Sequence, residues 1–428
     1  MRFYSTNKTS PAVSFREAVI KSLPEDKGLY FPEEVPELDF LFLETMDYYS
    51  KADIGYEVLR HYCSEDIPEA KLREILEDAL DFEIPLVGVE DNIYSLEMTH
   101  GPTYAFKDVG ARFLARCLGY FNESNNDEVT ILVATSGDTG GAVAAGFYDV
   151  PGVNVVILYP TGKVSDLQEK QLTTLGKNIR ALEVNGNFDD CQTMVKKAFL
   201  DKDVNEKLNL SSANSISIAR WLPQSIYYFW AYREAPKKKN LVVSVPSGNY
   251  GNLTAGLLAY KMGLQISRFI AASNVNDVVP RYLQSGDYEP KRTIHTLSNA
   301  MDIGDPSNYS RMQALFDGNH KEISKLISGY TLNDEQTLEV IKTCYEENEY
   351  ILDPHGAIGY DALKKGLGKK ETGVFIETAH YSKFLSTVNK ALGKELPLPD
   401  FVSELMKKEK EAVQIAADYE EFKAVLLG

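Results

Sequence analysis

The sequence predicts an α/β protein built around mostly parallel β-sheet, with helices on both faces of the sheet. The first observation is that, from about residue 90 onward, short apolar runs rich in β-branched residues alternate with segments of helical periodicity. The second is that two of these runs, residues 129–135 and 241–245, end close to a Ser-Gly pair, after which a helical segment begins. A strand, a glycine-containing loop and a helix form a βα unit, and repeated βα units build a parallel sheet.

The first 90 residues predict a small, mostly helical N-terminal domain. Three segments in it have the apolar spacing of amphipathic helices, namely residues 13–21, 42–59 and 68–80. The change of pattern near residue 90 divides the chain. We therefore expect one domain at residues 1–90 and a larger α/β region at residues 91–428.

Six strands are expected in the α/β region because each is a short apolar run bounded by turn residues. They are residues 129–135, 153–159, 179–184, 241–245, 269–272 and 373–378. The chain beyond about residue 395 is rich in charge, and it is expected to form a helical cap at residues 395–428 with solvated faces.

The composition limits the class of protein and its partners. The chain has 428 residues, of which 44% are hydrophobic and 25% are charged, as is typical of a globular protein of two or three domains. Its formal net charge of −17 argues against a nucleic-acid partner or an anionic membrane surface. An anionic small molecule could still bind where positive charge is local and enclosed.

Cysteine usage and the absence of long apolar segments predict a cytoplasmic protein with no membrane partner. The four cysteines are far apart and lack the spacing of a metal or redox site, so we expect buried thiols and no metal. No apolar stretch has the length of a membrane span, and the first residues do not form a signal peptide.

Each of the two Ser-Gly loops predicts an anion site. They read Ser136-Gly-Asp-Thr-Gly-Gly141 and Ser247-Gly-Asn-Tyr-Gly-Asn252. Free backbone N–H groups and the helix dipole favour an anion at the start of a helix. Neither loop is a P-loop or a dinucleotide fingerprint, and each alone is equally well an ordinary βα turn. As a pair, they indicate a protein that holds two anionic groups near each other.

Lys107 is a candidate for chemistry because of its place in the chain. It ends the segment His100-Gly-Pro-Thr-Tyr-Ala-Phe-Lys107 and starts a helical segment. A cation is disfavoured at a helix N-terminus, so the pKa of this amine could be lowered, which suits imine formation or general-base work. The other interpretation is a solvated lysine of the first turn, and the local pattern alone favours it.

Four ordered motifs resemble the threonine synthase family. They are His100-Gly-Pro-Thr-Tyr-Ala-Phe-Lys-Asp108, Thr135-Ser-Gly-Asp-Thr-Gly140, Asn214-Ser-Ile-Ser-Ile-Ala-Arg220 and Ser247-Gly-Asn-Tyr-Gly-Asn252. The opening Met1-Arg-Phe-Tyr-Ser-Thr6 and the segment Glu377-Thr-Ala-His380 are similar as well, so the likeness extends from residue 1 to about 390. It implies a two-lobed tryptophan-synthase-β-like fold, that of fold type II pyridoxal-phosphate enzymes, with the smaller lobe at about residues 110–235.

The resemblance also implies an activity. This is the pyridoxal 5'-phosphate-dependent lyase reaction that converts O-phospho-L-homoserine and water to L-threonine and phosphate, the last step of threonine biosynthesis. It combines γ-elimination of phosphate with β-addition of water. A phospho-lyase or amino-acid dehydratase of the same fold is an alternative and would release 2-oxobutanoate and ammonia. A regulatory protein that binds the cofactor without turnover is another.

The residues that match the family motifs are expected in the following roles. Lys107 is expected to carry the cofactor as a Schiff base and to move protons. The other expected cofactor-binding residues are Ser247, Gly248, Asn249, Tyr250, Gly251, Asn252, Thr378 and Asp138. Thr378 would face the pyridine nitrogen, whereas Asp138 would either approach the phenolic oxygen or cap a helix that begins near Thr139.

Nine residues are expected to bind the substrate. Four of them, in the first loop, would hold its α-carboxylate: Thr135, Ser136, Gly137 and Thr139. The other five would surround its phosphate: His100, Thr103, Asn214, Ser215 and Arg220. The donor fork of Arg220 suits a phosphate. Without the resemblance, the favoured interpretation of residues 214–220 is the capped start of a helix whose aromatic stripe is core.

Overall fold

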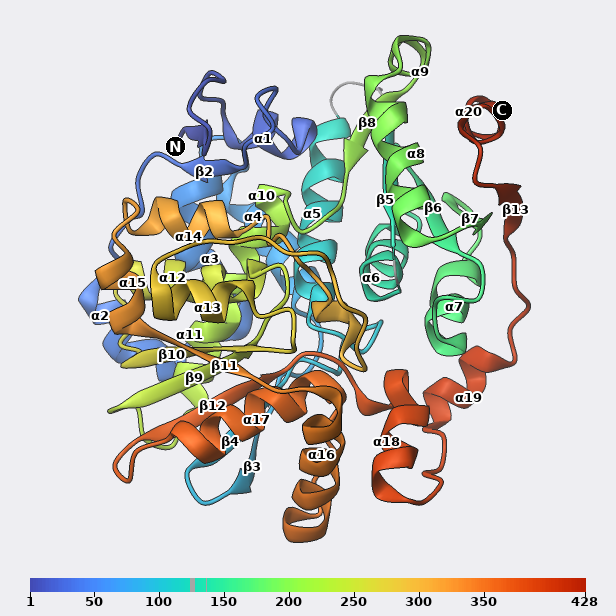
Figure 1. Cartoon of the computed structure of the whole chain (residues 1–428). Helices are drawn as coiled ribbons and strands as arrows, with labels where there is room; N and C mark the ends of the chain where they lie inside the picture. The colour runs from blue at the N-terminus through green and yellow to red at the C-terminus, as the bar shows by residue number, and fades with distance from the viewer. Residues whose placement is uncertain (124–127, 136) are drawn as a thin grey trace.

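The computed structural model describes residues 1–123, 128–135 and 137–428, and its strands form two large sheets, one in each lobe (Figure 1). Helix α5 (Lys107–Asn122) lies between the two lobes (Figure 1). The α/β architecture and the two lobes expected from the sequence are confirmed.

The larger sheet has six strands, which in spatial order are β11 (Ile327–Thr331), β10 (Arg268–Ser273), β9 (Leu241–Pro246), β12 (Thr372–Glu377), β4 (Ile93–Glu97) and β3 (Leu86–Glu90). All neighbouring strands are parallel except β3 and β4. Every residue of β9 and β12 is buried, which accounts for their continuous apolar runs because a central parallel strand is covered on both faces. The carboxyl ends of these two neighbours lead into Ser247 and Thr378, so both residues lie at the edge of the sheet where ligands of α/β proteins bind.

The smaller sheet has five parallel strands, which in spatial order are β13 (Val413–Ala416), β7 (Ile179–Asn185), β6 (Val153–Pro160), β5 (Val129–Ala134) and β8 (Asn209–Ser212). The six strands predicted from the sequence are β5, β6, β7, β9, β10 and β12, and all six are confirmed to within a few residues.

The end of the chain differs from the expected helical cap. Helices α19 (Asp400–Met406) and α20 (Tyr419–Leu427) are present, but β13 lies between them and pairs with β7 at the edge of the smaller sheet (Figure 1). Ile415 is buried in this strand, whereas Val413 is 48% exposed. A strand of four residues with one buried side chain gives too weak an alternation to be separated from a helix by pattern.

The N-terminal region is mostly helical, as predicted, with one antiparallel strand pair. Its elements are β1 (Phe3–Ser5), α1 (Phe15–Lys21), β2 (Tyr30–Pro32), α2 (Phe40–Thr45), η1 (Met46–Tyr48), α3 (Lys51–Cys63) and α4 (Glu69–Ala79). The prediction of one helix at residues 42–59 was wrong. Ser50 and Asp53 form a capping box at the start of α3, and this new N-terminus separates α3 from α2.

Further helices cover the two sheets and the space between them. Those near the smaller sheet are α6 (Asp138–Phe147), α7 (Asp166–Thr173), α8 (Phe188–Leu200) and α9 (Lys202–Lys207). The others are α10 (Ile218–Trp221), η2 (Leu222–Ser225), α11 (Ile226–Glu234), α12 (Gly251–Lys261), α13 (Val278–Ser285), η3 (Asn299–Met301), α14 (Tyr309–Leu315), α15 (His320–Leu326), α16 (Asp334–Asn348), α17 (Pro354–Gly366), η4 (Tyr381–Phe384) and α18 (Leu385–Leu392).

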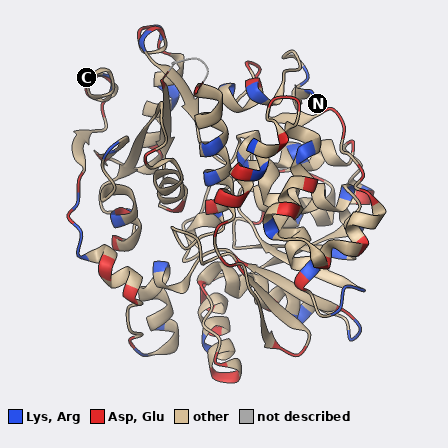
Figure 2. Ribbon diagram, turned by 180° about the vertical axis from the view of Figure 1, so that it is seen from behind, with Lys and Arg blue, Asp and Glu red and all other residues tan. Residues whose placement is uncertain are grey.

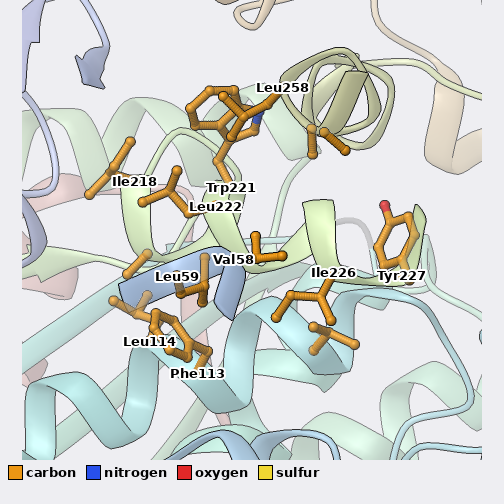
Figure 3. Close-up of a cluster of buried hydrophobic side chains, with 14 of the residues drawn as sticks. Val58, Leu59, Phe113, Leu114, Ile218, Trp221, Leu222, Ile226, Tyr227 and Leu258 are labelled. Atoms are coloured by element: carbon orange, nitrogen blue, oxygen red, sulfur yellow. The ribbon is translucent and has the colours of Figure 1, made fainter. Parts of the chain in front are cut away.

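The largest hydrophobic cluster joins the N-terminal helices to the centre of the molecule (Figure 3). Val58 and Leu59 of α3 lie in it close to Phe113 of α5 and to the α10–η2 segment (Figure 3). Trp221 is fully buried there and donates its Nε1–H to Thr254 Oγ1 at 2.9 Å. The cluster therefore fixes α5 and α10 against each other. The cysteines are buried and free, as predicted: Cys63, Cys117, Cys191 and Cys344.

Charged residues lie mainly on helices and loops, whereas the strands carry few of them (Figure 2). Basic and acidic residues are intermixed on the face seen from behind (Figure 2). In the described part of the chain, no helix is both long enough and apolar enough to cross a membrane.

Candidate active site

Lys107 is the first residue of α5, and a short polar clamp fixes this start. Thr103 donates its backbone N–H to Asp108 Oδ2 at 2.8 Å and its hydroxyl to Asp108 Oδ1 at 2.5 Å. Both residues are buried, so the loop before the helix is tied to its first turn. Tyr104 has a left-handed backbone with φ of 58°, which turns the chain into the helix. The position of Lys107 is therefore set by rigid neighbours on either side.

The strand end that carries Thr378 is joined directly to this segment. The N–H of Phe106 donates to the carbonyl of Thr378 at 2.9 Å, and Ala105 and Ala379 form an antiparallel bridge. Thr378 itself is buried. The segments that contain Lys107 and Thr378, which are far apart in the sequence, thus lie side by side.

The second Ser-Gly loop connects β9 to α12 and is held by its own side chains. Ser247 donates its hydroxyl to Asn252 Oδ1 at 2.5 Å, and Asn252 Nδ2 donates to the carbonyl of Pro246 at 2.8 Å. Tyr250 has a left-handed backbone with φ of 58°. A Cβ at Gly248 would collide with the backbone of Met301, so only glycine fits there.

The backbone N–H groups of residues 248–251 have no acceptor among the described residues. Gly248, Tyr250 and Gly251 are nevertheless buried, and Gly251 is the first residue of α12. Buried N–H groups without a partner are rare in proteins, and at a helix N-terminus they form an anion site. This loop has the donors that a phosphate group requires.

The first Ser-Gly loop is arranged around Thr135 and Asp138. Thr135 Oγ1 accepts from the N–H of Gly137 at 3.0 Å and from that of Gly140 at 2.9 Å. Helix α6 begins at Asp138, which is therefore inside the helix and does not cap it, contrary to one of the two roles expected from the sequence. Thr139 is half-buried, and Ser136 lies outside the described residues.

Asp138 forms a buried ion pair with Lys383, a residue that sequence reasoning missed. Lys383 Nζ lies 2.8 Å from Asp138 Oδ1 and also donates to the carbonyl of Thr103 at 2.9 Å. Gln168 Nε2 donates to the same Asp138 oxygen at 3.0 Å. Burial alone would raise the pKa of Asp138, but the charges of Lys383 and Lys107 outweigh it and hold the pKa well below its usual range.

No sequence signal distinguishes Lys383. It lies in η4, a few residues beyond Thr378, in a segment whose composition is that of an ordinary polar connection. Lysine is rarely buried, so pattern alone places it in solvent. In the structure its side chain has no exposed surface.

The surroundings of Lys107 favour a neutral amine. Burial lowers its pKa to about 8, the charges of Arg220 and Lys383 act in the same direction, and Asp138 opposes them. An amine whose pKa is this close to neutral pH has an appreciable neutral fraction, which can act as a nucleophile and as a base.

The lowered pKa of Lys107 has a measurable consequence for the cofactor-free protein. Covalent capture of an aldehyde requires the neutral amine, whose fraction grows with pH up to the pKa and is constant above it. We expect the second-order rate constant for capture of pyridoxal phosphate to rise about tenfold per pH unit up to about pH 8 and then to level off. Stopped-flow absorbance measures it. A rate that still rises steadily above pH 10 would contradict the lowered pKa.

Arg220 lies on the other side of the start of α5. It is buried in α10, and it donates from Nη1 to the carbonyl of Ala213 at 2.6 Å and from Nη2 to the carbonyl of Lys107 at 3.5 Å. Its Nε has no partner in the described part of the chain. Burial lowers the pKa of Arg220 to about 10, against the charge of Asp108.

Two further contacts decide which predicted residues lie together. Asn249 Nδ2 donates to Ser215 Oγ at 2.8 Å, so the segment that contains Asn214 and Ser215 touches the second loop. His100, by contrast, is 39% exposed and contacts Glu97 at 2.8 Å. The hydroxyl of Thr103 is directed to Asp108.

Three family models match consecutive and overlapping parts of the chain. Residues 82–378 match the model described as pyridoxal-phosphate dependent enzyme. Residues 2–80 match the threonine synthase N terminus, and residues 356–426 match the threonine synthase C-terminal model. This chain belongs to the threonine synthase family. The resemblance drawn from the sequence motifs is confirmed, and with it pyridoxal 5'-phosphate as the cofactor and a lyase activity.

Individual threonine synthases are similar over nearly the whole chain. The threonine synthase of Haemophilus influenzae is 47% identical over 94% of this chain and 93% of that protein. The crystal structure of threonine synthase from Escherichia coli superimposes with a TM-score of 0.92 at 42% identity, covering 100% of this chain and 99% of that one. The structure of pyridoxal-phosphate-bound threonine synthase from Brucella melitensis has a TM-score of 0.94 at 33% identity, with coverage of 100% and 99%.

Proposed function

We propose that this chain converts O-phospho-L-homoserine and water to L-threonine and phosphate, with Lys107 as the residue that binds the cofactor covalently and moves protons. The observation that carries the proposal is the position of Lys107, an amine of lowered pKa joined through Phe106 to Thr378 and through its carbonyl to Arg220. When bound, pyridoxal phosphate withdraws electrons from the substrate, which acidifies its Cα–H and Cβ–H bonds.

The second loop is proposed to hold the cofactor's phosphate. Its free N–H groups at residues 248–251 and the dipole of α12 support this, and the side chains of Ser247 and Asn252 keep the loop in shape. Thr378, at the end of β12, would hydrogen-bond the pyridine nitrogen. Asp138 would lie near Lys107 as one member of a buried ion pair, which supports an electrostatic role.

The substrate is proposed to bind across Lys107 between the first loop and the 214–220 segment. Its α-carboxylate would meet the N-terminus of α6, at Thr135, Ser136, Gly137 and Thr139. Its phosphate would meet Asn214, Ser215 and Arg220, with His100 and Thr103 as further candidates. The unpartnered Nε of Arg220 supports this because a buried guanidinium donor without an acceptor is costly unless a ligand supplies one.

Lys107 would act as the proton carrier once the substrate has displaced it from the cofactor. Its neutral amine can take a proton from Cα and return one to Cγ after phosphate has left. The charge of Asp138 opposes burial and the neighbouring cations, and the resulting pKa of about 8 lets the amine both gain and lose a proton near neutral pH.

Replacing Arg220 tests the substrate-phosphate site. We expect Arg220→Ala to raise KM for O-phospho-L-homoserine by about 10- to 100-fold, because a charge-assisted pair is lost, while the Kd for pyridoxal phosphate changes little. Arg220→Lys should restore part of the affinity. The matched control is Arg180→Ala, whose arginine is exposed on β7. Equal damage to KM and to cofactor binding would contradict the assignment.

Proton NMR of the products separates the synthase from its alternatives. A growing threonine methyl doublet with one phosphate released per threonine is the expected result. Accumulation of 2-oxobutanoate would instead support the dehydratase or phospho-lyase interpretation. No turnover with cofactor bound would support the regulatory one.

The proposal includes the organisation and setting of the chain. We propose an N-terminal domain at residues 1–90, a catalytic region at residues 91–428 with its smaller lobe at about 110–235, and a location in the cytoplasm. The proposed partner is a small-molecule substrate, O-phospho-L-homoserine. The acidic net charge of −17 supports the absence of a nucleic-acid partner.

A further inference from the structure

Arg311 is a buried cation without an acidic partner. It lies in α14 with no exposed surface, and in the described part of the chain it forms no ion pair. Its Nη2 donates to the carbonyls of Tyr30 at 3.1 Å and Ile216 at 2.7 Å, and its guanidinium lies 4.5 Å from the centre of the Trp221 ring. Burial lowers the pKa of Arg311 to about 9. Because an uncompensated buried charge is costly, an anion is expected close by.

Asn308 connects Arg311 to the N-terminus of α12. Its Oδ1 accepts from Arg311 Nη1 at 2.9 Å, and this contact fixes which way the amide points. Its Nδ2 is buried and has no acceptor among the described residues. The same Nδ2 lies 3.4 Å from the point where a Cβ on Gly251 would stand. The free amide therefore faces the first residue of α12, beside the unpaired N–H groups of the loop.

The hydrogen bond from Arg311 accounts for the Oδ1 of Asn308, but no contact among the described residues accounts for its buried Nδ2. The residue precedes α14 at the N-cap, where asparagine normally accepts from the N–H groups of the first turn. Asn308 makes no such side-chain bond. Its Oδ1 instead accepts from the side chain of Arg311, in the first turn of the same helix, and its Nδ2 lies toward Gly251 of α12. Asn308 thus does not cap its helix, and its buried Nδ2 keeps a donor without an acceptor among the described residues, which indicates a ligand.

We propose that Asn308 donates from Nδ2 to the phosphate group at the N-terminus of α12, and that Arg311 orients this amide and supplies the counter-charge. The inference rests on the proposed function because the anion is taken to be the cofactor's phosphate. A hydrogen bond from Arg311 polarises the Asn308 amide and strengthens its donor group. Asn308 is then a binding residue, and Arg311 is a positioning residue.

The comparison of pyridoxal phosphate with pyridoxal isolates the phosphate contact. The cofactor-free protein is titrated with each aldehyde, and Kd is measured by absorbance for the wild type, Asn308→Ala and Asn308→Asp. We expect Asn308→Ala to raise the Kd for pyridoxal phosphate by about 10- to 100-fold and the Kd for pyridoxal by less than about twofold. Asn308→Asp should weaken pyridoxal phosphate further, because it replaces a donor with a negative charge.

Two variants control for folding and for position. Gln313→Ala removes a side-chain amide on the same helix that donates to Tyr282, and it should leave both Kd values unchanged. Arg311→Lys keeps the charge. It should raise the Kd for pyridoxal phosphate but not for pyridoxal, and by less than Asn308→Ala does. Melting temperatures of the cofactor-free variants show whether each is folded. If Arg311→Lys is unfolded, the Asn308 variants alone are sufficient for the test.

The outcomes separate this inference from the proposed function. Equal weakening of both aldehydes by Asn308→Ala would overturn it, as would no effect on either. An Asn308→Ala variant that binds both aldehydes normally but has a raised KM for O-phospho-L-homoserine would also overturn it, because the amide would then serve the other phosphate. If the wild type itself bound pyridoxal as tightly as pyridoxal phosphate, the second loop, residues 247–252, would not be a phosphate site. That result would contradict the proposed function as well.

Discussion

Replacing Lys107 by alanine should abolish threonine formation and the covalent link to pyridoxal phosphate. In the proposed function this amine is both the attachment point of the cofactor and the proton carrier. General acid–base catalysis alone contributes about 10²- to 10⁴-fold to a rate, and covalent attachment adds to it, so we expect kcat to fall by at least about 10³-fold. The loss is measured as phosphate release at saturating cofactor. The imine absorption band should be absent from the variant.

Lys383 makes the control for this experiment essential. It is a second buried amine whose charge acts on Lys107, so a covalent link could in principle form at either residue. Borohydride reduction of the wild type, followed by peptide mass analysis, should place the label on Lys107. A label on Lys383 would contradict the assignment. Added methylamine should restore part of the activity of Lys107→Ala, because a diffusible amine can replace the missing base.

The sequence was sufficient for the framework of the site. Buried parallel strands give continuous apolar runs, so β5, β6, β7, β9, β10 and β12 could be predicted from short-range pattern. Thr378 follows the carboxyl end of β12 and accepts from Phe106, the neighbour of Lys107. Ser215 contacts Asn249 in the loop after β9, and α/β topology favours ligand sites at this edge of a sheet. Motif resemblance supplied the chemical roles proposed for these residues, which the apolar pattern alone left open.

Other features depend on contacts between segments that are distant in the sequence, so no local sequence pattern predicts them. Lys383 and Arg311 belong to residue types that are usually exposed, and their burial is decided by partners more than 200 positions away, at Asp138 and Tyr30. The unused amide of Asn308 is visible only once Gly251 lies beside it. Short edge strands such as β13 are likewise decided by the strand they pair with.

Replacing Lys383 by methionine should destabilise the protein and raise the pKa of Lys107. Asp138 would remain buried without its nearest cation, and breaking a buried ion pair by removing one partner costs about 3–5 kcal/mol in the free energy of unfolding. Loss of a neighbouring positive charge also favours the protonated form of Lys107. Capture of pyridoxal phosphate by the cofactor-free variant should therefore level off at a higher pH than in the wild type.

The pH dependence of this loss follows from the direction of the Asp138 shift. The pKa of Asp138 in the folded protein lies well below its unfolded value, so its stabilising contribution is present above about pH 4 and is lost as the pH falls further. The difference in unfolding free energy between wild type and Lys383→Met should therefore be largest near pH 7 and should shrink below about pH 4. Urea unfolding at several pH values measures it.

Two comparisons test whether the loss of stability in Lys383→Met arises from breaking a buried ion pair. Lys177→Met breaks the exposed pair with Asp149, whose side chains are 53% and 62% exposed, and it should cost less than about 1 kcal/mol. Adding Asp138→Asn to Lys383→Met should recover much of the lost stability, because no carboxylate is then left buried without Lys383. If Lys383→Met cost no more than Lys177→Met at every pH, Asp138 would not be held as an ion by Lys383, and the charge balance around Lys107 would need another source.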